Sequence, residues 1–289
     1  MHLGGMLDDK KSAVYKLVHP RYLPQTIIIK KDDNIEAKIK EAGLNYPLIV
    51  KPDVGFKGFM VRKVDSLTEL NGLKASFGQR EMLLQEFVDT AKEYSIMCYK
   101  LNRSSTYEIS SFVEKILPYI VGDGITTIED LIINLSNPFL KKEIVLYKFR
   151  TCLHDILPKG QKMIIDHVGN YARGSKFYNR SKQIDEDLTR AMNNFFTGIN
   201  GLNFGRLDLK ADSIDDIKNG NFKLLEINGA KAEPIHIYDP TMSISSMMKD
   251  ISFHWRTLFK IVKENQHHQI PSTAEGLRSF RSLKKAVNP

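Results

Sequence analysis

Two short segments carry the side chains best suited to chemistry, one near residue 206 and the other near residue 226. Residues 206–209 read Arg-Leu-Asp-Leu, and residues 225–228 read Leu-Glu-Ile-Asn. Because side chains alternate across a strand, Arg206 and Asp208 share one face of the first segment. Glu226 and Asn228 likewise share one face of the second. If the two strands pair, two carboxylates, an amide oxygen and an arginine converge above an apolar floor.

Such a convergence predicts a metal site. Two carboxylates brought together repel each other unless a cation lies between them. Oxygen ligands of this kind, too few to form a complete cage, suit Mg²⁺ that completes its octahedron with water and nucleotide phosphates. The alternative is a solvated sheet face with ordinary alternation of charge, and the spacing alone leaves both interpretations open.

A second candidate segment, residues 47–58, reads Pro-Leu-Ile-Val-Lys-Pro-Asp-Val-Gly-Phe-Lys-Gly. Lys51 ends a buried strand and supplies a fixed positive charge, while Gly55 and Gly58 let backbone N–H groups approach phosphate oxygens. The segment lacks the Lys-Ser/Thr ending of a P-loop, and no helix is predicted directly after it. A simple hairpin with a solvated lysine is the alternative.

The third candidate segment is residues 84–88, which read Leu-Gln-Glu-Phe-Val and are followed by Glu93. A strand that leads into a connector exposes backbone N–H and C=O groups, which match the edge of an adenine ring. A carboxylate a few residues later can hold ribose hydroxyls. The alternative is an ordinary strand end.

Strands and helices have to position these side chains. Strands are predicted where apolar and β-branched residues lie between turn residues, at 26–29, 48–51, 59–64, 82–88, 93–99, 203–210 and 222–228. Ser66 with Glu69 predicts a capped helix over 67–76, and Thr126 with Glu129 predicts a second capped helix. Residues 185–199 have the periodicity of an amphipathic helix. Helices and strands mixed along the chain indicate the α+β class.

Near the C-terminus, apolar residues recur every three or four positions. They are Met248, Ile251, Trp255, Leu258 and Val262. This spacing predicts an amphipathic helix whose apolar side packs on the body of the protein.

Composition excludes several classes of protein. The 289 residues are 42% hydrophobic and 26% charged, which is typical of a folded globular protein and not of a disordered or fibrous one. No apolar run approaches the roughly 20 residues of a membrane span, and residues 1–11 have no apolar signal segment. The two cysteines, Cys98 and Cys152, are predicted to be buried free thiols. We therefore expect a cytoplasmic protein.

The positive charge gathers at the C-terminal end. The chain has a net charge of +8, and residues 254–289 hold seven Lys or Arg against two Glu, a net of +5. Ser272 and Glu275 predict a further capped helix in this basic tail. The tail can lie on an anionic membrane or bind a partner, or it can be a docked helix with a solvated basic face. Nucleic acid is not expected, because aromatic residues do not alternate with the basic ones.

In their order along the chain, these segments resemble the ATP-grasp superfamily over roughly residues 10–240. Within it, residues 121–131 and 157–176 resemble the group that contains D-alanine–D-alanine ligase, cyanophycin synthetase and bifunctional glutathione synthetase. The resemblance implies an α+β ATP-grasp fold, with ATP and Mg²⁺ between two α+β subdomains. These are residues 26–90 and 91–240 of a core spanning 26–240, preceded by a lead-in (1–25) that is the remnant of, or replacement for, a further domain. Residues 241–289 form C-terminal helices with the basic tail.

The resemblance also implies the nucleotide ligands. Lys51 and Lys11 contact the α- and β-phosphates, and the loop Gly55–Gly58, with Lys57, closes over the β- and γ-phosphates. The residues implied to line the adenine are Gln85, Glu86, Phe87 and Val88. Glu93 binds the ribose.

Metal binding and catalysis are implied in the same way. Asp208, Glu226 and Asn228 hold one or two Mg²⁺ ions, with Mn²⁺ as an alternative. Asn170, Arg173 and Lys176 lie in a loop near the γ-phosphate and the acceptor. Attack on a charged γ-phosphate depends mainly on charge neutralisation and alignment, so the implied catalytic residues are Arg206, Lys51 and Arg173.

The implied activity is ATP-dependent joining of a carboxylate to an amine through an acylphosphate, with release of ADP and phosphate and with amino-acid or peptide-like substrates. A kinase acting on a hydroxyl acceptor and a non-catalytic or membrane-associated ATP-binding module are the alternatives, and a homo-oligomer is left open. The group usually has a substrate domain of roughly a hundred residues before the core. Only about 25 residues precede the core here, so we expect either that this domain is absent or that the sequence is a fragment that begins partway through the protein. The loop after residue 228 also lacks the group's Pro-Gly run. There, Lys231 and His236 either contact substrate or belong to a loop that closes the site.

Overall fold

The structure is a computed structural model of the chain. It describes residues 10–55, 58, 60–90, 92–101, 103–265, 274 and 281. The chain divides into two compact units, the first made of residues 1–114 and 178–289 and the second of residues 115–177. The predicted subdomain boundaries at residues 25, 90 and 240 follow a different division and stay predictions.

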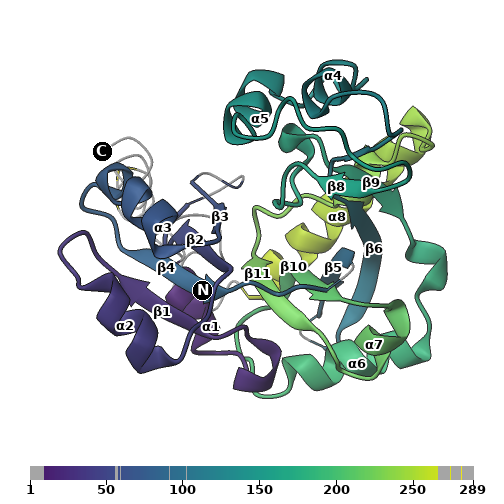
Figure 1. Ribbon diagram of the computed structural model, residues 1–289. Coiled ribbons are helices and arrows are strands. Elements are labelled where there is room, and N and C mark those ends of the chain that lie inside the picture. Colours follow the sequence, from purple (N-terminus) through teal and green to yellow (C-terminus); the bar gives the residue numbers. More distant parts are fainter. Residues whose placement is uncertain are drawn as a thin grey trace. The chain divides into compact units, whose positions relative to one another are not determined.

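The first unit contains a four-stranded antiparallel sheet in the order β1-β4-β2-β3 (Figure 1). Its strands are β1 (Thr26–Ile29), β2 (Leu48–Pro52), β3 (Arg62–Val64) and β4 (Met82–Glu86). Leu48 and Val50 pack with Leu84 against residues of α2 (Ile35–Ala42) and α3 (Leu67–Lys74). Because side chains alternate along β2, Lys51 points to the opposite face of this sheet.

Side-chain caps fix where the two helices on this sheet begin. Ser66 Oγ accepts a hydrogen bond from the Glu69 N–H at 3.2 Å, so the predicted cap of α3 is confirmed. Asn34 Oδ1 caps α2 by accepting from the Ala37 N–H at 3.1 Å. The prediction missed α2, because its eight residues bury only Ile35 and Ile39 and so give a weak helical period.

A five-stranded sheet in the order β11-β10-β5-β6-β9 follows. Its strands are β5 (Lys92–Tyr99), β6 (Glu108–Ile116), β9 (Lys176–Asn179), β10 (Phe204–Ala211) and β11 (Lys223–Asn228). Leu207 and Leu209 of β10 join a core with buried residues of α6 (Glu186–Phe196) and α7 (Ile214–Lys218). The alternate residues of β10, including Arg206 and Asp208, therefore face away from that core.

The segment before the first strand is part of the same core. It forms α1 (Lys11–Tyr15) and a short 3₁₀ helix, Pro20–Tyr22. Val14, Val18 and Tyr22 are buried in the cluster that contains Leu207 and Leu209. Residues 10–25 are thus built into the first unit, and α1 comes to lie against β11.

The second unit has its own small core. This unit contains the antiparallel strand pair β7 (Tyr119–Val121) and β8 (Lys162–Ile164), and the chain between them forms α4 (Ile128–Ile133) and α5 (Lys142–Lys148). A Cβ at Gly122 would overlap the carbonyl oxygens of Leu157 and Pro158, so only glycine fits this turn.

The predicted cap of α4 is wrong by one residue. Thr127, and not Thr126, caps the helix by accepting from the Asp130 N–H. The reason is that Asp123 accepts hydrogen bonds from both the backbone N–H and the hydroxyl of Thr126. The Thr126 side chain therefore completes the preceding turn.

A long helix, α8 (Ile244–Glu264), closes the described part of the first unit. Its docked face differs from the predicted one, because the buried residues are His254, Thr257 and Ile261 while Trp255 and Val262 are exposed. Polar contacts decide this rotation of the helix. His236 and Asp250 lie 3.0 Å apart (Nε2 to Oδ2), and His254 Nε2 lies 3.0 Å from Ser110 Oγ.

The prediction of buried free thiols is confirmed for Cys98 and only in part for Cys152. Both are free thiols, but Cys152 is only partly buried, and burial raises the pKa of the Cys98 thiol. Within the part of the chain described, every helix is too short or too polar to cross a membrane. The capped helix predicted from Ser272 and Glu275 lies outside the described residues.

Acid is expected to loosen α8. Burial lowers the pKa of His254 and a neighbouring His236 acts in the same direction, against the opposing effects of the Asp250 carbonyl and carboxylate. A histidine whose pKa is lowered on folding stabilises the folded state above the unfolded pKa of about 6.5 and loses that effect as the pH falls. We expect a lower melting temperature at pH 5.5 than at pH 7.5, with a smaller difference in His254→Gln. The exposed His154 provides the control His154→Gln, and an unchanged pH dependence in His254→Gln would contradict the assignment.

Candidate active site

The predicted pairing of the two acidic strands is confirmed. β10 and β11 are antiparallel neighbours in which Arg206 lies opposite Asn228, and Asp208 lies opposite Glu226. Directly opposed residues of an antiparallel pair point to the same face. The two carboxylates, the amide and the guanidinium therefore share the face that points away from the Leu207 core.

Asp208 is the most constrained member of this group, with 7% of its surface exposed. Its carboxylate accepts hydrogen bonds from Arg206 Nε at 3.0 Å and Nη2 at 3.2 Å, and from Asn228 Nδ2 at 3.3 Å. The Ser95 hydroxyl donates a further bond from β5. Burial disfavours the charged form of Arg206, but the Asp208 charge and hydrogen bond outweigh that effect and raise the pKa of Arg206. The pair is held as an ion pair.

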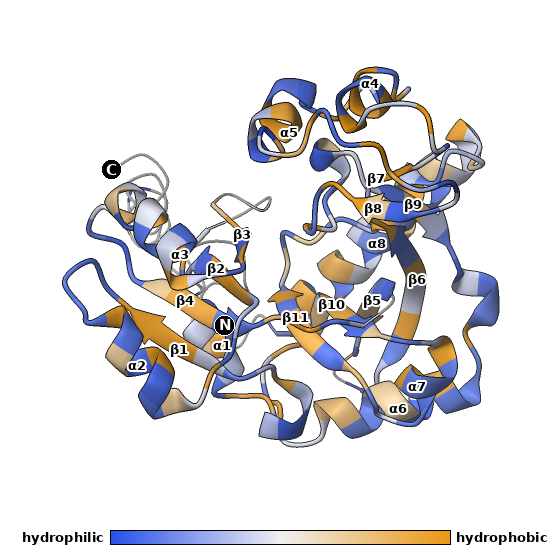
Figure 2. Ribbon diagram, in the orientation of Figure 1, coloured by the Kyte–Doolittle hydropathy of each residue, from blue (hydrophilic) through white to orange (hydrophobic). Residues whose placement is uncertain are grey.

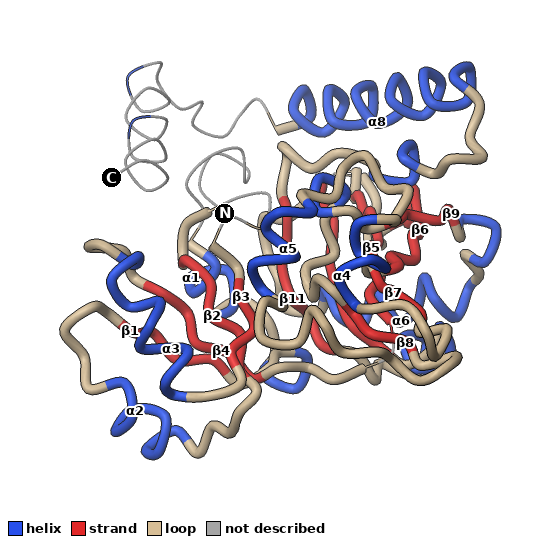
Figure 3. The backbone as a smooth tube through the Cα atoms, turned by 45° about the horizontal axis from the view of Figure 1, so that its top comes forward, coloured by secondary structure: helices blue, strands red, loops and turns tan. Residues whose placement is uncertain are grey.

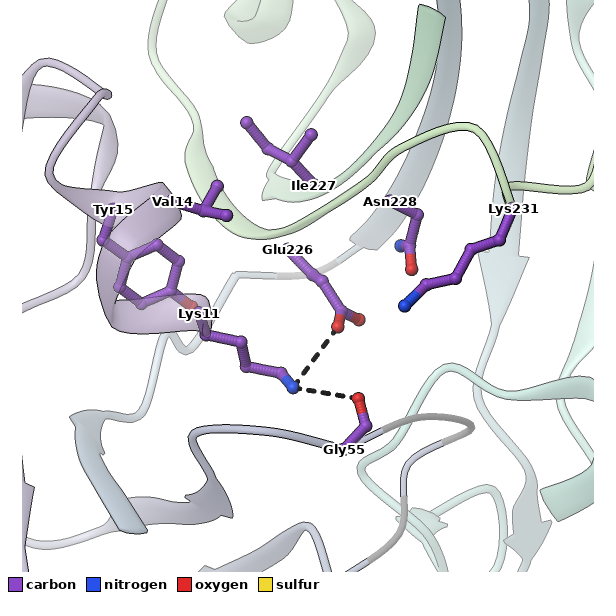
Figure 4. A pocket seen from close by; sticks show the side chains of 8 residues that line it. All are labelled: Lys11, Val14, Tyr15, Gly55, Glu226, Ile227, Asn228 and Lys231. Atoms are coloured by element: carbon purple, nitrogen blue, oxygen red, sulfur yellow. Dashed lines mark hydrogen bonds and ion pairs between the residues drawn. The ribbon is translucent and has the colours of Figure 1, made fainter. Parts of the chain in front are cut away.

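Glu226 lines a small pocket in the first unit (Figure 4). The lining residues are Lys11, Val14, Tyr15, Gly55, Glu226, Ile227, Asn228 and Lys231. Lys11 Nζ lies 3.5 Å from Glu226 Oε1 and donates to the Gly55 carbonyl at 3.2 Å. Each of the two acids thus has its own cation, Arg206 for Asp208 and Lys11 for Glu226.

Within the described part of the chain, Lys51 is a buried cation whose hydrogen-bond acceptors are all uncharged. With 6% of its surface exposed, its amino group donates to the Tyr15 hydroxyl at 2.8 Å, to Gln85 Oε1 at 2.8 Å and to the Leu225 carbonyl at 3.3 Å. Tyr15 in turn donates to the Leu225 carbonyl at 2.6 Å. Neutral acceptors leave the positive charge of Lys51 uncompensated, which is the state that an anionic ligand requires.

The glycine loop is tied to α1 through Asp53. The Asp53 carboxylate accepts from the Ser12 N–H at 2.8 Å and from the Ser12 hydroxyl at 2.7 Å. The Lys11 N–H donates to the Asp53 carbonyl at 3.0 Å. These bonds hold Lys11 beside Gly55, whereas Lys57 lies outside the described residues.

The predicted adenine segment divides into two environments. Gln85 is buried, and its side chain is engaged by Lys51 and by Thr26, to whose hydroxyl Gln85 Nε2 donates at 2.7 Å. Glu86 ends β4 and is exposed. Phe87 and Val88 follow the strand end, where they meet Lys210.

Lys210 of β10 contacts this segment through its amino group. Its amino group donates to the Val88 carbonyl at 2.8 Å and lies 4.9 Å from the centre of the Phe87 ring. Glu93 lies opposite Lys210 in the β10–β5 register and is 5% exposed. Burial lowers the pKa of Lys210, an effect that the charges of Glu93 and Asp89 oppose. The proposed ribose and adenine contacts of these residues stay predictions.

Three predicted residues lie in or beside the 3₁₀ turn of the second unit. Arg173 Nε and Nη2 donate to the Asp166 carboxylate at 2.7 and 2.9 Å. Asn170 Oδ1 caps the turn Tyr171–Arg173 by accepting from the Ala172 N–H at 2.8 Å, and Lys176 begins β9. Their roles toward a γ-phosphate stay predictions.

The contacts of His236 favour the interpretation in which it belongs to a loop that closes the site. It lies in the 3₁₀ helix Ile235–Tyr238 after β11, is 3% exposed, and contacts Asp250 of α8 through Nε2. The loop between β11 and α8 is thus fixed from inside the fold. Lys231, by contrast, extends into the pocket beside Asn228 (Figure 4).

The donor set fits Mg²⁺ better than a softer metal. In the described part of the chain, no three His, Cys, Asp or Glu side chains cluster as a metal cage would require. Two carboxylates and one amide oxygen leave most of an octahedron to water and phosphate oxygens, as is usual for Mg²⁺ in nucleotide sites. Sequence reasoning missed two residues of this region, Tyr15 and Ser95, for which no local pattern gave a signal. The alternation of Arg206 and Asp208 placed Lys210 on the same face, but no role was predicted for it.

Comparisons with known proteins bear on the fold. The profile of the RimK-like ATP-grasp domain matches residues 8–105. The carboxyaminoimidazole ribonucleotide synthase of Aspergillus clavatus, solved with ATP, is 11% identical with a TM-score of 0.50, and the alignment covers 92% of this chain and 53% of that one. A likeness at this level concerns the fold alone.

Two ligases have similar structures at lower scores. The VanG D-Ala:D-Ser ligase of Enterococcus faecalis is 17% identical with a TM-score of 0.47, over 86% of this chain and 61% of the ligase. The D-alanine–D-alanine ligase of Bacillus anthracis is 14% identical with a TM-score of 0.46, over 96% and 68%. The chain therefore spans less than two thirds of the length of the VanG ligase. No curated protein matched in the sequence search.

Proposed function

From the ATP-grasp fold of this chain as the premise, we propose that it is an ATP- and Mg²⁺-dependent ligase that joins a carboxylate to an amine. The observation that carries the proposal is the shared face of β10 and β11, where Asp208, Glu226 and Asn228 converge. Lys11 and Lys51 lie beside that face and supply positive charge for phosphates. The bound Mg²⁺ would neutralise phosphate charge and orient the γ-phosphoryl group.

The residues of the chain have distinct tasks in this proposal. Lys51 donates to phosphate oxygens by exchanging one of its neutral acceptors. Lys11 is held near Gly55 and the β- and γ-phosphates by the bonds of Asp53 to Ser12. Arg206 pairs with Asp208 and presents its remaining N–H groups to negative charge that develops on the acyl oxygen.

The reaction has two steps that balance in charge and atoms. A carboxylate oxygen of the acid attacks the γ-phosphorus, an O–P bond forms, and the bond to the bridging oxygen breaks with ADP as leaving group. An amine then attacks the acyl carbon, phosphate leaves with its oxygen, and the amine proton passes to solvent. Because water destroys an acylphosphate, the site must exclude it until the amine binds.

An ADP-release screen tests the proposal. With ATP, Mg²⁺ and a panel of amino acids, dipeptides and hydroxy acids, we expect ADP and phosphate to form only when both an acid and an amine are present. Omitting the amine provides the matched control. Release of AMP would contradict the mechanism. A product that retains the γ-phosphate would identify a kinase that uses the same ATP site on a hydroxyl acceptor.

A further inference from the structure

An apolar stripe runs along the outside of α8 and is not used to dock the helix. Its members are Ile244, Met248, Trp255, Phe259 and Val262, which are 79, 61, 64, 67 and 56% exposed. Their spacings of four, seven, four and three residues place them on one line of an α-helix. We refer to these five residues as the α8 stripe. Figure 3 shows the helix that carries it as one uninterrupted element, and Figure 2 colours the same helix by hydropathy.

The stripe is not left over from packing. The residues that bury against the body, His254, Thr257 and Ile261, are centred roughly a third of a turn from the centre of the stripe at 100° per residue. The helix is held there by the contacts of Asp250 with His236 and of His254 with Ser110. Single exposed apolar side chains are common on soluble proteins, but five large ones on one line of a helix mark an interaction surface.

Positive charge borders the stripe on its solvent side. Lys249, Arg256, Lys260 and Lys263 are exposed and share the adjacent arc of the helix. We refer to these four residues as the α8 flank. The two acids of the helix are Asp250, which lies against His236, and Glu264 at its end. Residues 266–289 add four more cations and a single acid by sequence.

We propose that the α8 stripe docks on an anionic lipid surface, with the helix lying in the plane of the interface. Tryptophan, phenylalanine and aliphatic residues on one side and lysine or arginine beside them are the composition of interfacial helices. The stripe covers 18 helical steps, about 27 Å at 1.5 Å per residue, which is enough for a stable contact along the membrane. The helix lies on the membrane and does not cross it.

Charge favours a lipid surface over a second copy of the chain. In an antiparallel pair of α8 helices, the α8 flank of one copy would face the same four cations of the other, and like charges that meet in this way repel. An anionic headgroup layer instead attracts each of these cations. The proposal does not depend on the ligase activity.

The single tryptophan of the chain reports directly on the proposal. Trp255 is the only tryptophan and belongs to the α8 stripe, so entry into lipid shifts its emission to shorter wavelength. We expect this shift, together with co-sedimentation, when the full chain meets phosphatidylcholine vesicles that contain about one third phosphatidylglycerol. Pure phosphatidylcholine is expected to bind at least about tenfold more weakly, and so are the anionic vesicles at high salt, where charges are screened.

Variants assign the contact to α8. The double variant Met248→Ser with Phe259→Ser retains Trp255 as the reporter. It is expected to weaken binding at least about tenfold, because two apolar side chains that would be buried in lipid are lost. Arg256→Gln, Lys260→Gln and Lys263→Gln together should weaken it roughly a hundredfold, at about fivefold per cation. Ile125→Ser removes an equally exposed apolar residue of the second unit and is expected to bind like the parent chain.

Four outcomes would overturn the proposal. The first is the absence of binding to either vesicle, and the second is binding that the Met248→Ser and Phe259→Ser changes leave intact. The third is a blue shift without vesicles that grows with protein concentration, since a second copy would then cover the stripe. The fourth is binding that depends only on the tail, as judged by replacing Arg278, Arg281, Lys284 and Lys285 with Gln.

Discussion

Asp208→Asn is expected to lower the rate of ADP formation on the order of a thousandfold, the size of effect seen when a group that stabilises charge in the transition state is removed. The substitution keeps the shape of the side chain. It also keeps some of the hydrogen bonds that this side chain accepts from Ser95 and Arg206. It removes the negative charge that we propose for metal binding and leaves Arg206 without its ion-pair partner. The measurement is ADP release at saturating ATP and Mg²⁺, with circular dichroism to show that the fold persists.

A matched control is available in the same unit. Asp239 is also buried, and it accepts hydrogen bonds from the Asn179 N–H and from Thr241, away from the β10–β11 face. Asp239→Asn therefore tests whether any buried carboxylate has this effect, and we expect it to change stability more than activity. Equal losses of activity in the two variants would remove Asp208 from the proposed metal site.

Lys51→Met is expected to weaken ATP binding about a hundredfold without lowering the melting temperature. A hydrogen bond to a charged group contributes about 1.5–3 kcal/mol, and the acceptors described for the buried ammonium are all neutral. Methionine fills a similar volume and removes the cost of burying a charge, which offsets the loss of these hydrogen bonds, so the melting temperature should change little. The measurements are calorimetric ATP affinity and the melting temperature of the free protein.

Lys38→Met serves as the control for Lys51→Met. Lys38 lies on α2 and pairs with Asp33 at 2.6 Å, so its removal should leave ATP affinity unchanged. A lower melting temperature with intact ATP binding in Lys51→Met would show that Lys51 is a structural residue.

Local patterns predicted the strands that carry the site. The alternation at 206–210 and 225–228 was sufficient to predict which side chains of each strand share a face. The register that places Asp208 opposite Glu226 comes from the structure. The α+β class and the ATP-grasp fold are likewise confirmed. Helix α6 follows its predicted apolar period, with Asp185 as its cap.

Long-range contacts were beyond that reasoning. The position of Tyr15 between Lys51 and Leu225 depends on residues 36 and 210 positions away, and no local pattern encodes it. The prediction of which face of α8 docks on the body was wrong for a related reason. Periodicity finds every apolar residue of a helix, but the histidine and aspartate contacts with Ser110 and His236 decide which side meets the body.

The three acceptors of Lys51 have a mechanical consequence. An ammonium has three protons to donate, and all three are already used, so a phosphate oxygen that binds Lys51 has to displace an existing acceptor. Two of the bonds remain within α1 and the sheet of β2, while the third and longest, at 3.3 Å, reaches the Leu225 carbonyl of β11. A bound nucleotide would therefore replace the hydrogen bond from Lys51 to the Leu225 carbonyl, which connects the two sheets, by a bond to its phosphate. The nucleotide itself would then bridge the two sheets.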